Sequence, residues 1–331
     1  MNMLVGKCQT RNYISAMSPA GKTKKTVAVI GYGSQGRAVA LNLRDSGYKV
    51  VVGLRSRSAS RAVAAKDRPG DVATIPEAVK KADVVCFAIP DHRHVQVYER
   101  NVAPNVRHGV TLLFLHGLSV HFGMVVPAAF CDVILIAPHA PGRAVREKYL
   151  TDRSLSAFYA VGQDFTGHAR RTALELARAI GFKPQRLIAT TFEHEAVGDL
   201  FGEQAVLCGG LAALIKNGFE VLVEKGIPAE NAYLEVAYQL DLIVQLLKEH
   251  GIEGMLRRIS VAARYGSARA GPRIIDRTVR DRMKEVADEI ITGKFSRGLA
   301  KLSGADIIKL NRSLKKLTDP RLEKAARKFN R

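Results

Sequence analysis

Short apolar, β-branched runs alternate with amphipathic helical stretches from Thr26 to about Thr191. Strands buried on both faces read as continuous apolar runs, and amphipathic helices connect parallel strands, so the alternation predicts βαβ units and a mostly parallel sheet. The predicted strands are TVAVI (26–30), VVVGL (50–54), VATI (72–75), VVCFAI (84–89), TLLFL (111–115), VILIAP (133–138), AFYAV (157–161) and RLIATT (186–191).

The strand pattern stops after Thr191, and three long stretches of helical periodicity follow, at 200–226, 228–251 and 271–293, each of which ends at a glycine. We therefore expect an α/β N-terminal domain followed by an all-α C-terminal domain. The predicted division is an N-terminal extension at 1–24, an α/β domain at 25–190 and an all-helical domain at 191–331.

Gly31, Gly33 and Gly36 form a G-x-G-x-x-G turn between the first predicted strand and a helical stretch. Glycines at this spacing allow a tight turn and close backbone approach, so that a pyrophosphate can bind the free N–H groups of the helix N-terminus. The strand–turn–helix context predicts a Rossmann-like dinucleotide site. An ordinary tight βα turn is the alternative.

The loop after the second strand favours NADP over NAD. An NAD site needs an acidic residue at the end of that strand to bind the ribose 2′-hydroxyl, but here Arg55 follows the strand and no carboxylate occurs before Asp67. Guanidinium and hydroxyl groups suit a 2′-phosphate, and a solvated basic loop is the alternative. The loop offers Arg55, Arg57, Ser58, Ser60 and Arg61.

Two carboxylates near the start of the helical half, Asp199 and Glu203, are spaced i, i+4 and share one helix face. Like charges at this spacing are unfavourable by a few tenths of a kcal/mol. A divalent ion such as Mg²⁺ between them would offset this, because it takes carboxylate ligands and keeps other positions for water and substrate. A solvated acidic helix face is the alternative.

The net charge of +20 raises the question of a nucleic-acid partner. The Lys and Arg residues are spread along the chain without interleaved aromatics that would stack on bases, so we expect no nucleic-acid function, and charge of this size also draws small anions to a cleft. No apolar run reaches the roughly 18 residues of a membrane span. Four cysteines without C-x-x-C spacing fit a reducing compartment, and we expect a cytoplasmic protein without a membrane partner.

The sequence resembles the ketol-acid reductoisomerase family, in its short form with one helical domain, from about residue 24 to 295. The block DLFGEQAVLCGG (199–210) is the most selective part of the resemblance. The other matching segments are GYGSQG (31–36), LNLRDSG (41–47), VVVGLR (50–55), HG (116–117), HFG (121–123), TTF (190–192), AYLE (232–235), YG (265–266) and GPRIID (271–276).

The resemblance implies an enzyme of valine and isoleucine biosynthesis. Such an enzyme takes a 2-hydroxy-3-keto acid, either 2-acetolactate or 2-aceto-2-hydroxybutyrate, through Mg²⁺-dependent alkyl migration and then reduces it with NADPH to a 2,3-dihydroxy acid. It also implies an NADP-binding Rossmann domain at 25–190, a helical domain at 191–331 for metal, substrate and dimerisation, and a homodimer or larger assembly.

The resemblance also implies roles for individual residues. His116 would be the catalytic histidine beside the nicotinamide, and Ser260 would contact substrate. Asp199 and Glu203 would bind metal, and Glu235 would complete the second metal site from a partner subunit. The implied cofactor-binding residues, besides Gly31, Gly33 and Gly36, are Tyr32, Ser34, Gln35, Arg55, Ser58, Ser60, Asp91, His92, Arg93, His94 and Gly142.

Two positions depart from the family pattern. The family's active-site lysine is His139 here, and its second helical glutamate is Gln239. The two changes together leave the formal charge of the site unchanged, so we hypothesise a retuned site in which His139 does proton work and the second metal ion is held more loosely near Gln239. The alternatives are an NADPH-dependent 2-keto-acid reductase without isomerisation and a non-catalytic anion-binding relative.

Overall fold

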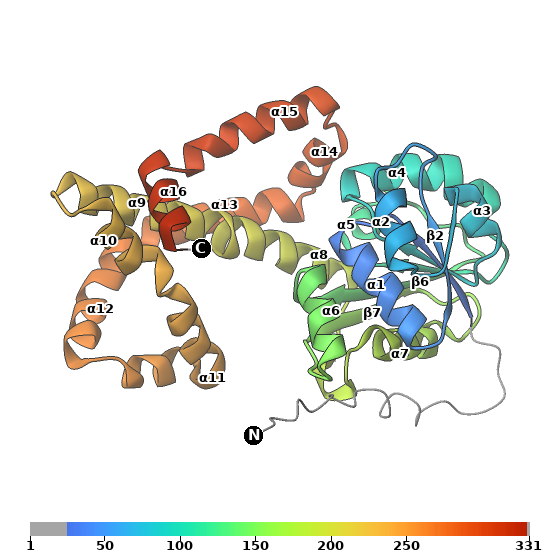
Figure 1. The fold of residues 1–331 in the computed structure, drawn as a ribbon, viewed down its shortest axis with the longest axis horizontal. Coiled ribbons are helices and arrows are strands. Elements are labelled where there is room, and N and C mark those ends of the chain that lie inside the picture. The colour runs from blue at the N-terminus through green and yellow to red at the C-terminus, as the bar shows by residue number, and fades with distance from the viewer. Residues whose placement is uncertain (1–24, 330–331) are drawn as a thin grey trace, which may run out of the picture.

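The computed structural model describes residues 25–329, so the predicted N-terminal extension at 1–24 lies outside the described residues. The chain forms an α/β half followed by a helical half, and one long helix leads from the first to the second (Figure 1). This order confirms the predicted fold class.

The α/β half contains a single sheet with the strand order β3-β2-β1-β4-β5-β6-β7-β8. All neighbouring strands pair in parallel except β6 and β7, which are antiparallel. Each predicted strand is present, and the sheet is mostly parallel as expected. The strands are β1 (Thr26–Ile30), β2 (Lys49–Gly53), β3 (Asp71–Ala73), β4 (Val84–Phe87), β5 (Thr111–Phe114), β6 (Asp132–Pro138), β7 (Ala157–Gln163) and β8 (Leu187–Ala189).

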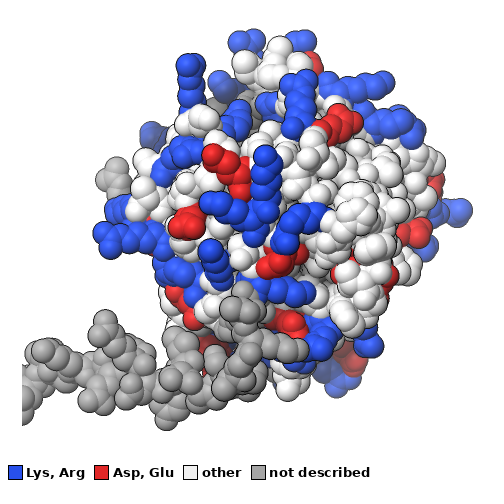
Figure 2. Space-filling view, turned by 90° about the vertical axis from the view of Figure 1, so that its right-hand side faces the viewer, with Lys and Arg blue, Asp and Glu red and all other residues white. Residues whose placement is uncertain are grey.

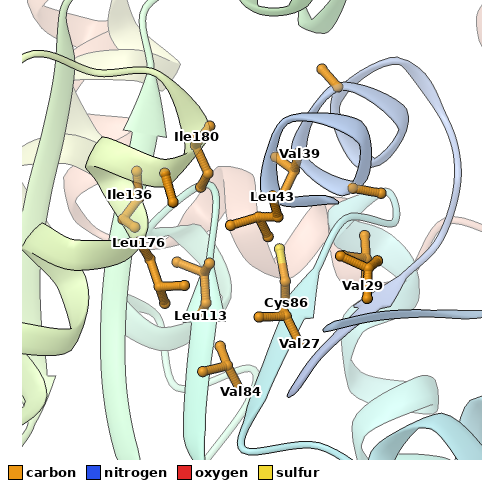
Figure 3. Close-up of a cluster of buried hydrophobic side chains, with 14 of the residues drawn as sticks. Val27, Val29, Val39, Leu43, Val84, Cys86, Leu113, Ile136, Leu176 and Ile180 are labelled. Carbon is orange, nitrogen blue, oxygen red and sulfur yellow. The ribbon is translucent and has the colours of Figure 1, made fainter. Parts of the chain in front are cut away.

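Helices cover both faces of this sheet. On one face, Val39 and Leu43 of α1 and Leu176 of α7 pack on strand residues such as Val29 and Cys86 (Figure 3). These side chains are fully or almost fully buried, because the helices present one apolar stripe to a sheet that is apolar on both sides. The helical elements of this half are α1 (Ser34–Asp45), α2 (Ser60–Asp67), α3 (Ile75–Lys80), η1 (Asp91–Arg93), α4 (His94–Val97), η2 (Tyr98–Val102), η3 (Ala103–Asn105), α5 (Leu118–His121), α6 (Gly142–Leu150), α7 (Ala169–Ile180) and η4 (Pro184–Arg186).

The helical half begins at Phe192, and α8, η5 and α9 form one continuous helix of 33 residues to Glu224. Two π-helical turns, η5 and η6, interrupt the regular helices of this half. Its elements are α8 (Phe192–Phe201), η5 (Gly202–Leu207), α9 (Gly209–Glu224), α10 (Ala229–Tyr233), η6 (Leu234–Tyr238), α11 (Leu240–Arg258), α12 (Val261–Ile274), α13 (Arg277–Ile291), α14 (Lys294–Ala300), α15 (Gly304–Ser313), η7 (Leu314–Leu317) and α16 (Pro320–Phe329).

Two small apolar clusters organise the helical half. Phe219 and Tyr233 join α9, α10 and α16, while Leu118, Leu200 and Ile290 connect α5 of the α/β half with α8 and α13. In contrast, α11 and α12 project away from the body (Figure 1). These two helices contain no buried residue.

Basic side chains are distributed over the end of the α/β half that Figure 2 shows, with acidic side chains among them. No single uninterrupted basic stripe crosses this face.

The Phe192–Glu224 helix is long and apolar enough to cross a membrane by length and composition, and little of its most apolar window is buried. No continuous apolar run in the sequence reveals this, because Glu203, Gln204 and Lys216 interrupt it. One such helix is weak evidence for a membrane span. Its exposed apolar side chains require an explanation.

Candidate active site

The glycine turn lies at the carboxyl end of β1, where Gly31 has φ +100° and a Cβ atom would meet the carbonyl oxygen of Ala88 at 2.6 Å. A Cβ at Gly36 would lie 2.5 Å from the carbonyl oxygen of Gly31. A Cβ at Gly33 would have no protein atom within 4 Å, so packing does not explain that glycine, whereas close approach of a ligand does. Gly33 is the N-cap residue of α1 and provides no side-chain cap, which leaves backbone N–H groups available to a phosphate.

The basic loop follows β2 at the same edge. Arg55 and Arg57 are exposed, and neither guanidinium has an ion-pair partner within residues 25–329. Arg61 differs, because its guanidinium donates to the carbonyl oxygens of Arg55 and Ala73 at 3.1 and 3.2 Å. Ser58 accepts from the backbone N–H of Ser60 at 3.3 Å. Arg61 therefore supports the loop, and Arg55 and Arg57 remain available to an anion.

The loop after β6 packs directly on the glycine turn. A Cβ at Gly142 would lie 2.1 Å from the carbonyl oxygen of Ser34, and Gln35 donates from Nε2 to the carbonyl oxygen of Ala140 at 2.8 Å. The Gln35 Oε1 atom is buried and has no hydrogen-bond partner among the described residues, which leaves an acceptor for a bound ligand. His139 begins this loop, is exposed, and packs edge-on against Phe158 with ring centroids 4.3 Å apart.

Asp91 and His116 follow β4 and β5, which are neighbouring parallel strands. Because parallel strands end at the same edge of a sheet, the two side chains meet there. The Nδ1 atom of His116 lies 3.5 Å from Oδ1 of Asp91. The family resemblance implies that Asp91 binds the cofactor, and the structure places its carboxylate beside the predicted catalytic histidine.

The helix α8 adds two carboxylates to this edge. Thr191 caps the helix by accepting from the backbone N–H of His194 at 3.0 Å. Glu195 accepts from the backbone N–H of Gly117 at 2.5 Å, and Oδ2 of Asp199 lies 3.3 Å from Nε2 of His116. Ligand atoms of His116, Glu195 and Asp199 all lie within 4.8 Å of one another, a grouping that could hold a metal ion.

The charges of this cluster affect one another's protonation. Burial by itself would lower the pKa of His116, but the hydrogen bond to Asp91 and the charges of Glu195 and Asp199 outweigh it and raise that pKa to about 9. Burial raises the pKa of Glu195 to about 7. Burial and the charge of Asp199 raise the pKa of Glu203. Concentrated negative charge that is partly buried is an environment that a divalent cation would stabilise.

Glu195 is the site residue that the sequence analysis missed. It is 4% exposed and lies four residues before Asp199, which lies four before Glu203. Three acidic residues at successive i, i+4 positions of one helix form one stripe, and this spacing could have identified it.

The segment from His92 to His94 has two different environments. His92 and Arg93 lie on η1 with solvent-accessible side chains. His94 is 2% exposed, and its ring nitrogens lie 2.7 Å from Oγ of Ser119 and 2.9 Å from the carbonyl oxygen of Ile89. Since both nitrogens are engaged within the protein, His94 can support the loop that bears Asp91 but offers no free nitrogen to a cofactor.

Three predicted residues lie away from this cluster within the chain. Glu235 and Gln239 are exposed on and next to η6, and Nε2 of Gln239 donates to Oε2 of Glu235 at 3.1 Å. Val236 of η6 lies beside Gly218 of α9, where an added Cβ atom would be 3.6 Å from Cγ1 of Val236. The 19 residues of helix from Asp199 to Gly218 correspond to about 28 Å. Ser260 caps α12 by accepting from the backbone N–H of Ala263 at 3.1 Å. One chain therefore does not bring these three residues to His116.

Comparisons with known proteins cover both halves. Residues 22–185 match the family model described as "Acetohydroxy acid isomeroreductase, NADPH-binding domain", and residues 192–331 match "Ketol-acid reductoisomerase, C-terminal domain". The chain is 50% identical over 273 residues to "Ketol-acid reductoisomerase (NADP(+))" of Pyrobaculum aerophilum, covering 82% of this chain and 83% of the relative.

Two further relatives extend the match. The enzyme of the same name from Pyrococcus abyssi is 45% identical over 304 residues, or 92% of this chain and 91% of the relative. The solved structure of an NADH-preferring ketol-acid reductoisomerase from an uncultured archean is 38% identical and superposes with a TM-score of 0.87, covering 92% and 94% of the two chains. With both domain models matched and identity of this extent, the chain belongs to the ketol-acid reductoisomerase family.

Proposed function

We propose that the protein is an NADP-dependent ketol-acid reductoisomerase of the cytoplasm that acts in valine and isoleucine biosynthesis. It converts 2-acetolactate or 2-aceto-2-hydroxybutyrate to a 2,3-dihydroxy acid by alkyl migration and hydride transfer from NADPH. The observation that carries this proposal is the position of His116, between Asp91 and Asp199 at the sheet edge that also bears the glycine turn. Family membership supports the same activity.

The residues of the cluster fit a divalent ion. Asp199 and Glu203 from the α8–η5 helix would hold it, with Glu195 close by, and oxygen donors are those that Mg²⁺ prefers. When bound, such ions supply Lewis-acid polarisation of the ketone. Glu203 and Glu235 each lie in a π-helical turn, a local irregularity that is frequent at functional sites.

The chain's own groups hold a proton and the cofactor. Oδ1 of Asp91 lies 3.5 Å from Nδ1 of His116 and favours a proton on that nitrogen, so Nε2, which faces Asp199, is the nitrogen that can hold or release a proton at the reacting ketone. The glycine turn binds the pyrophosphate at the N-terminus of α1. Arg55, together with Ser58 and Ser60, binds the 2′-phosphate.

A second copy of the chain completes the site. Leu242, Ile252, Val261 and Tyr265 of α11 and α12 are 60 to 71% exposed, which is a large apolar area for a free surface. Glu235, Gln239 and Ser260 lie in the same region. A second copy that covers these helices would bury the apolar side chains and bring Glu235 to the partner's Asp199. The same cover explains the exposed apolar face of the 33-residue helix better than a lipid bilayer does, because Lys216 and Glu220 pair on it.

Complementation between two inactive variants tests this assembly. Asp199→Ala and Glu235→Ala, each inactive alone, are co-expressed with different tags. If each site combines Asp199 of one chain with Glu235 of the other, mixed dimers retain one intact site, and activity recovers to about a quarter of the wild-type value. Asp199→Ala with Glu203→Ala is the matched control and recovers nothing, because both residues come from the same chain. Absence of recovery in the first mixture would contradict the shared site.

The activity itself is tested by NADPH oxidation with Mg²⁺. Turnover of 2-acetolactate supports the complete reaction. Turnover of 3-hydroxy-3-methyl-2-ketobutyrate alone supports the second candidate, a reductase without isomerisation. That candidate is favoured by the hydrogen bond from the amide of Gln239 to Glu235, because a neutral amide there makes a weaker ion site than a second carboxylate. NADPH binding without turnover of either compound would reject both enzymatic functions.

A further inference from the structure

The helix α2, which begins at the end of the basic loop, is weakly anchored by apolar contacts. Among its eight residues only Ala64 is buried, and an alanine contributes little apolar area. The loop that it holds has exposed Arg55 and Arg57 side chains. Fixing such a loop around a phosphate costs conformational entropy unless other contacts fix it beforehand.

Polar contacts at the far end of α2 provide this anchor. Asp67, the last residue of the helix, accepts from Nε and Nη2 of Arg37 at 2.6 and 2.9 Å and from the hydroxyl of Tyr32 at 3.1 Å. Its side chain is 12% exposed and that of Arg37 is 53% exposed. Two parallel bonds between a guanidinium and a carboxylate fix orientation as well as distance.

The partners of Asp67 belong to the other half of the cofactor site. Tyr32 lies within the glycine turn and is 5% exposed, and Arg37 lies in the first turn and a half of α1. Arg44, also on α1, donates to the carbonyl oxygens of Asp67 and Arg68 at 2.9 and 2.8 Å. Thus α1 and the glycine turn hold the C-terminal end of α2 through one carboxylate and two carbonyl groups.

We propose that Asp67, clasped by Arg37 and Tyr32, is a positioning residue that fixes α2 and the loop at 55–60 for the 2′-phosphate, and thereby sets the preference for NADPH over NADH. The inference rests on the proposed phosphate-binding role of that loop. Asp67 itself touches no phosphate; it acts through the helix that carries Ser60 at its first position. NADH lacks the 2′-phosphate and gains nothing from the loop at 55–60, so loss of the Asp67 contacts should weaken NADPH binding more than NADH binding.

The protonation behaviour of the clasp agrees with a permanent contact. The hydrogen bond from Arg37 lowers the pKa of Asp67, and burial, together with the charge of Asp67, raises the pKa of Tyr32. The carboxylate therefore stays ionised and the phenol stays protonated at every pH at which the protein would work, and the hydrogen bonds of the clasp persist.

The test compares cofactor binding by the full-length wild type and by Asp67→Ala, with dissociation constants for NADPH and NADH from cofactor fluorescence. We expect the constant for NADPH to rise about tenfold and that for NADH to stay within about twofold, a loss of about 1.4 kcal/mol of discrimination. The KM for NADPH should rise in parallel, with kcat at saturating NADPH within about twofold, because the clasp lies away from the reacting groups.

Two further variants separate positioning from a general loss of structure. Asp67→Asn keeps an acceptor for Arg37 and should restore part of the discrimination. Arg171→Ala removes the exposed Arg171–Glu175 pair on α7 and should leave both constants unchanged. If Asp67→Ala weakens the binding of NADPH and NADH equally, the ratio of the two dissociation constants is unchanged and the positioning role of Asp67 is rejected. A wild-type preference for NADPH would in that case leave the proposed function intact. A wild type that does not prefer NADPH would reject both the proposed 2′-phosphate site and the positioning role of Asp67.

Discussion

The two halves of the molecule bury their apolar side chains to very different extents. In the α/β half, two clusters of buried residues fill both faces of the sheet. In the helical half, the buried clusters contain only a few residues, and Leu207, Leu214, Val221 and Leu247 are 41 to 66% exposed.

This difference has a direct meaning for function. A parallel sheet covered by helices is complete within one chain, and the cofactor turn lies on it. The helical half cannot hide its apolar surface by itself, and it also carries the predicted site residues that lie far from His116. The helical half therefore leaves apolar side chains exposed and leaves some predicted site residues far from His116. A second copy of the chain would bury those side chains and complete the site.

Removing the carboxylate where the halves meet should have the largest effect. Asp199→Ala deletes the group that faces Nε2 of His116, so we expect kcat to fall by about 10³-fold or more, since metal and charge stabilisation supplies several kcal/mol. NADPH affinity, which depends on the α/β half, should change by less than about threefold. Steady-state kinetics and cofactor titration measure the two effects, and a proportional loss of both would show that the halves do not act separately.

Substitutions of a core leucine and of a surface leucine should have very different effects on the stability of the protein. Leu43 is fully buried and Leu242 is 60% exposed. Leu43→Ala should lower the free energy of unfolding by about 3 kcal/mol through lost contacts and a cavity. Leu242→Ala should change it by less than about 0.5 kcal/mol in the isolated chain but shift the dimer dissociation constant. Chemical denaturation measures the free energy of unfolding, and sedimentation measures the dimer dissociation constant. Equal destabilisation by both variants in dilute monomer would contradict the prediction.

The two departures from the family pattern lie one in each half. His139→Lys combined with Gln239→Glu should raise turnover of 2-acetolactate about tenfold, since each restores a charge that the other balances. Each single substitution adds an uncompensated charge and should gain little. A double variant with no gain in kcat would reject the retuned-site hypothesis, and the wild type assayed with equal Mg²⁺ is the control.

The smallest predicted effect concerns Glu195, which connects α8 to the backbone N–H of Gly117. Its pKa is raised from 4.5 to about 7, so the folded protein binds this proton more tightly than the unfolded chain. Its contribution to stability is fully present below about pH 4.5 and is lost as pH rises through about 7. In metal-free protein, Glu195→Gln should flatten this decline, because the amide does not titrate. Urea titrations from pH 4 to 8 measure how the free energy of unfolding depends on pH in the wild type and the variant. The same pH dependence in both proteins would contradict the prediction.

Much of the fold follows from local pattern. Runs such as TVAVI are apolar at every position, which suits only a strand covered on both faces, and the glycine spacing at 31–36 predicts a strand, a turn and a helix in that order. The antiparallel pairing of β7 was not predicted, because the direction of a strand depends on the path of its connection and leaves little trace in the apolar pattern.

The site was only partly predictable. Asp199 and Glu203 share a helix face by spacing, and the same spacing extends to Glu195, but the contact of Glu195 with Gly117, a residue 78 positions away, could come only from the structure. Likewise, no spacing places Asp91 against His116 or Asp67 against Arg37. The π-helical turns at Glu203 and Glu235 also left no periodic signal, since one additional residue per turn is invisible in a short apolar pattern.

The sequence by itself determined the strands, the glycine turn, the change from α/β to helical architecture and the family. These depend on residue type and short-range periodicity, which physical chemistry links directly to backbone conformation and burial. Only the tertiary structure decided which charged groups meet: His116 with Asp91 and Asp199, and Asp67 with Arg37 and Tyr32. Such meetings depend on how strands and helices are stacked in space, and the energy of a charge pair depends on distances and burial that exist only after the chain has folded.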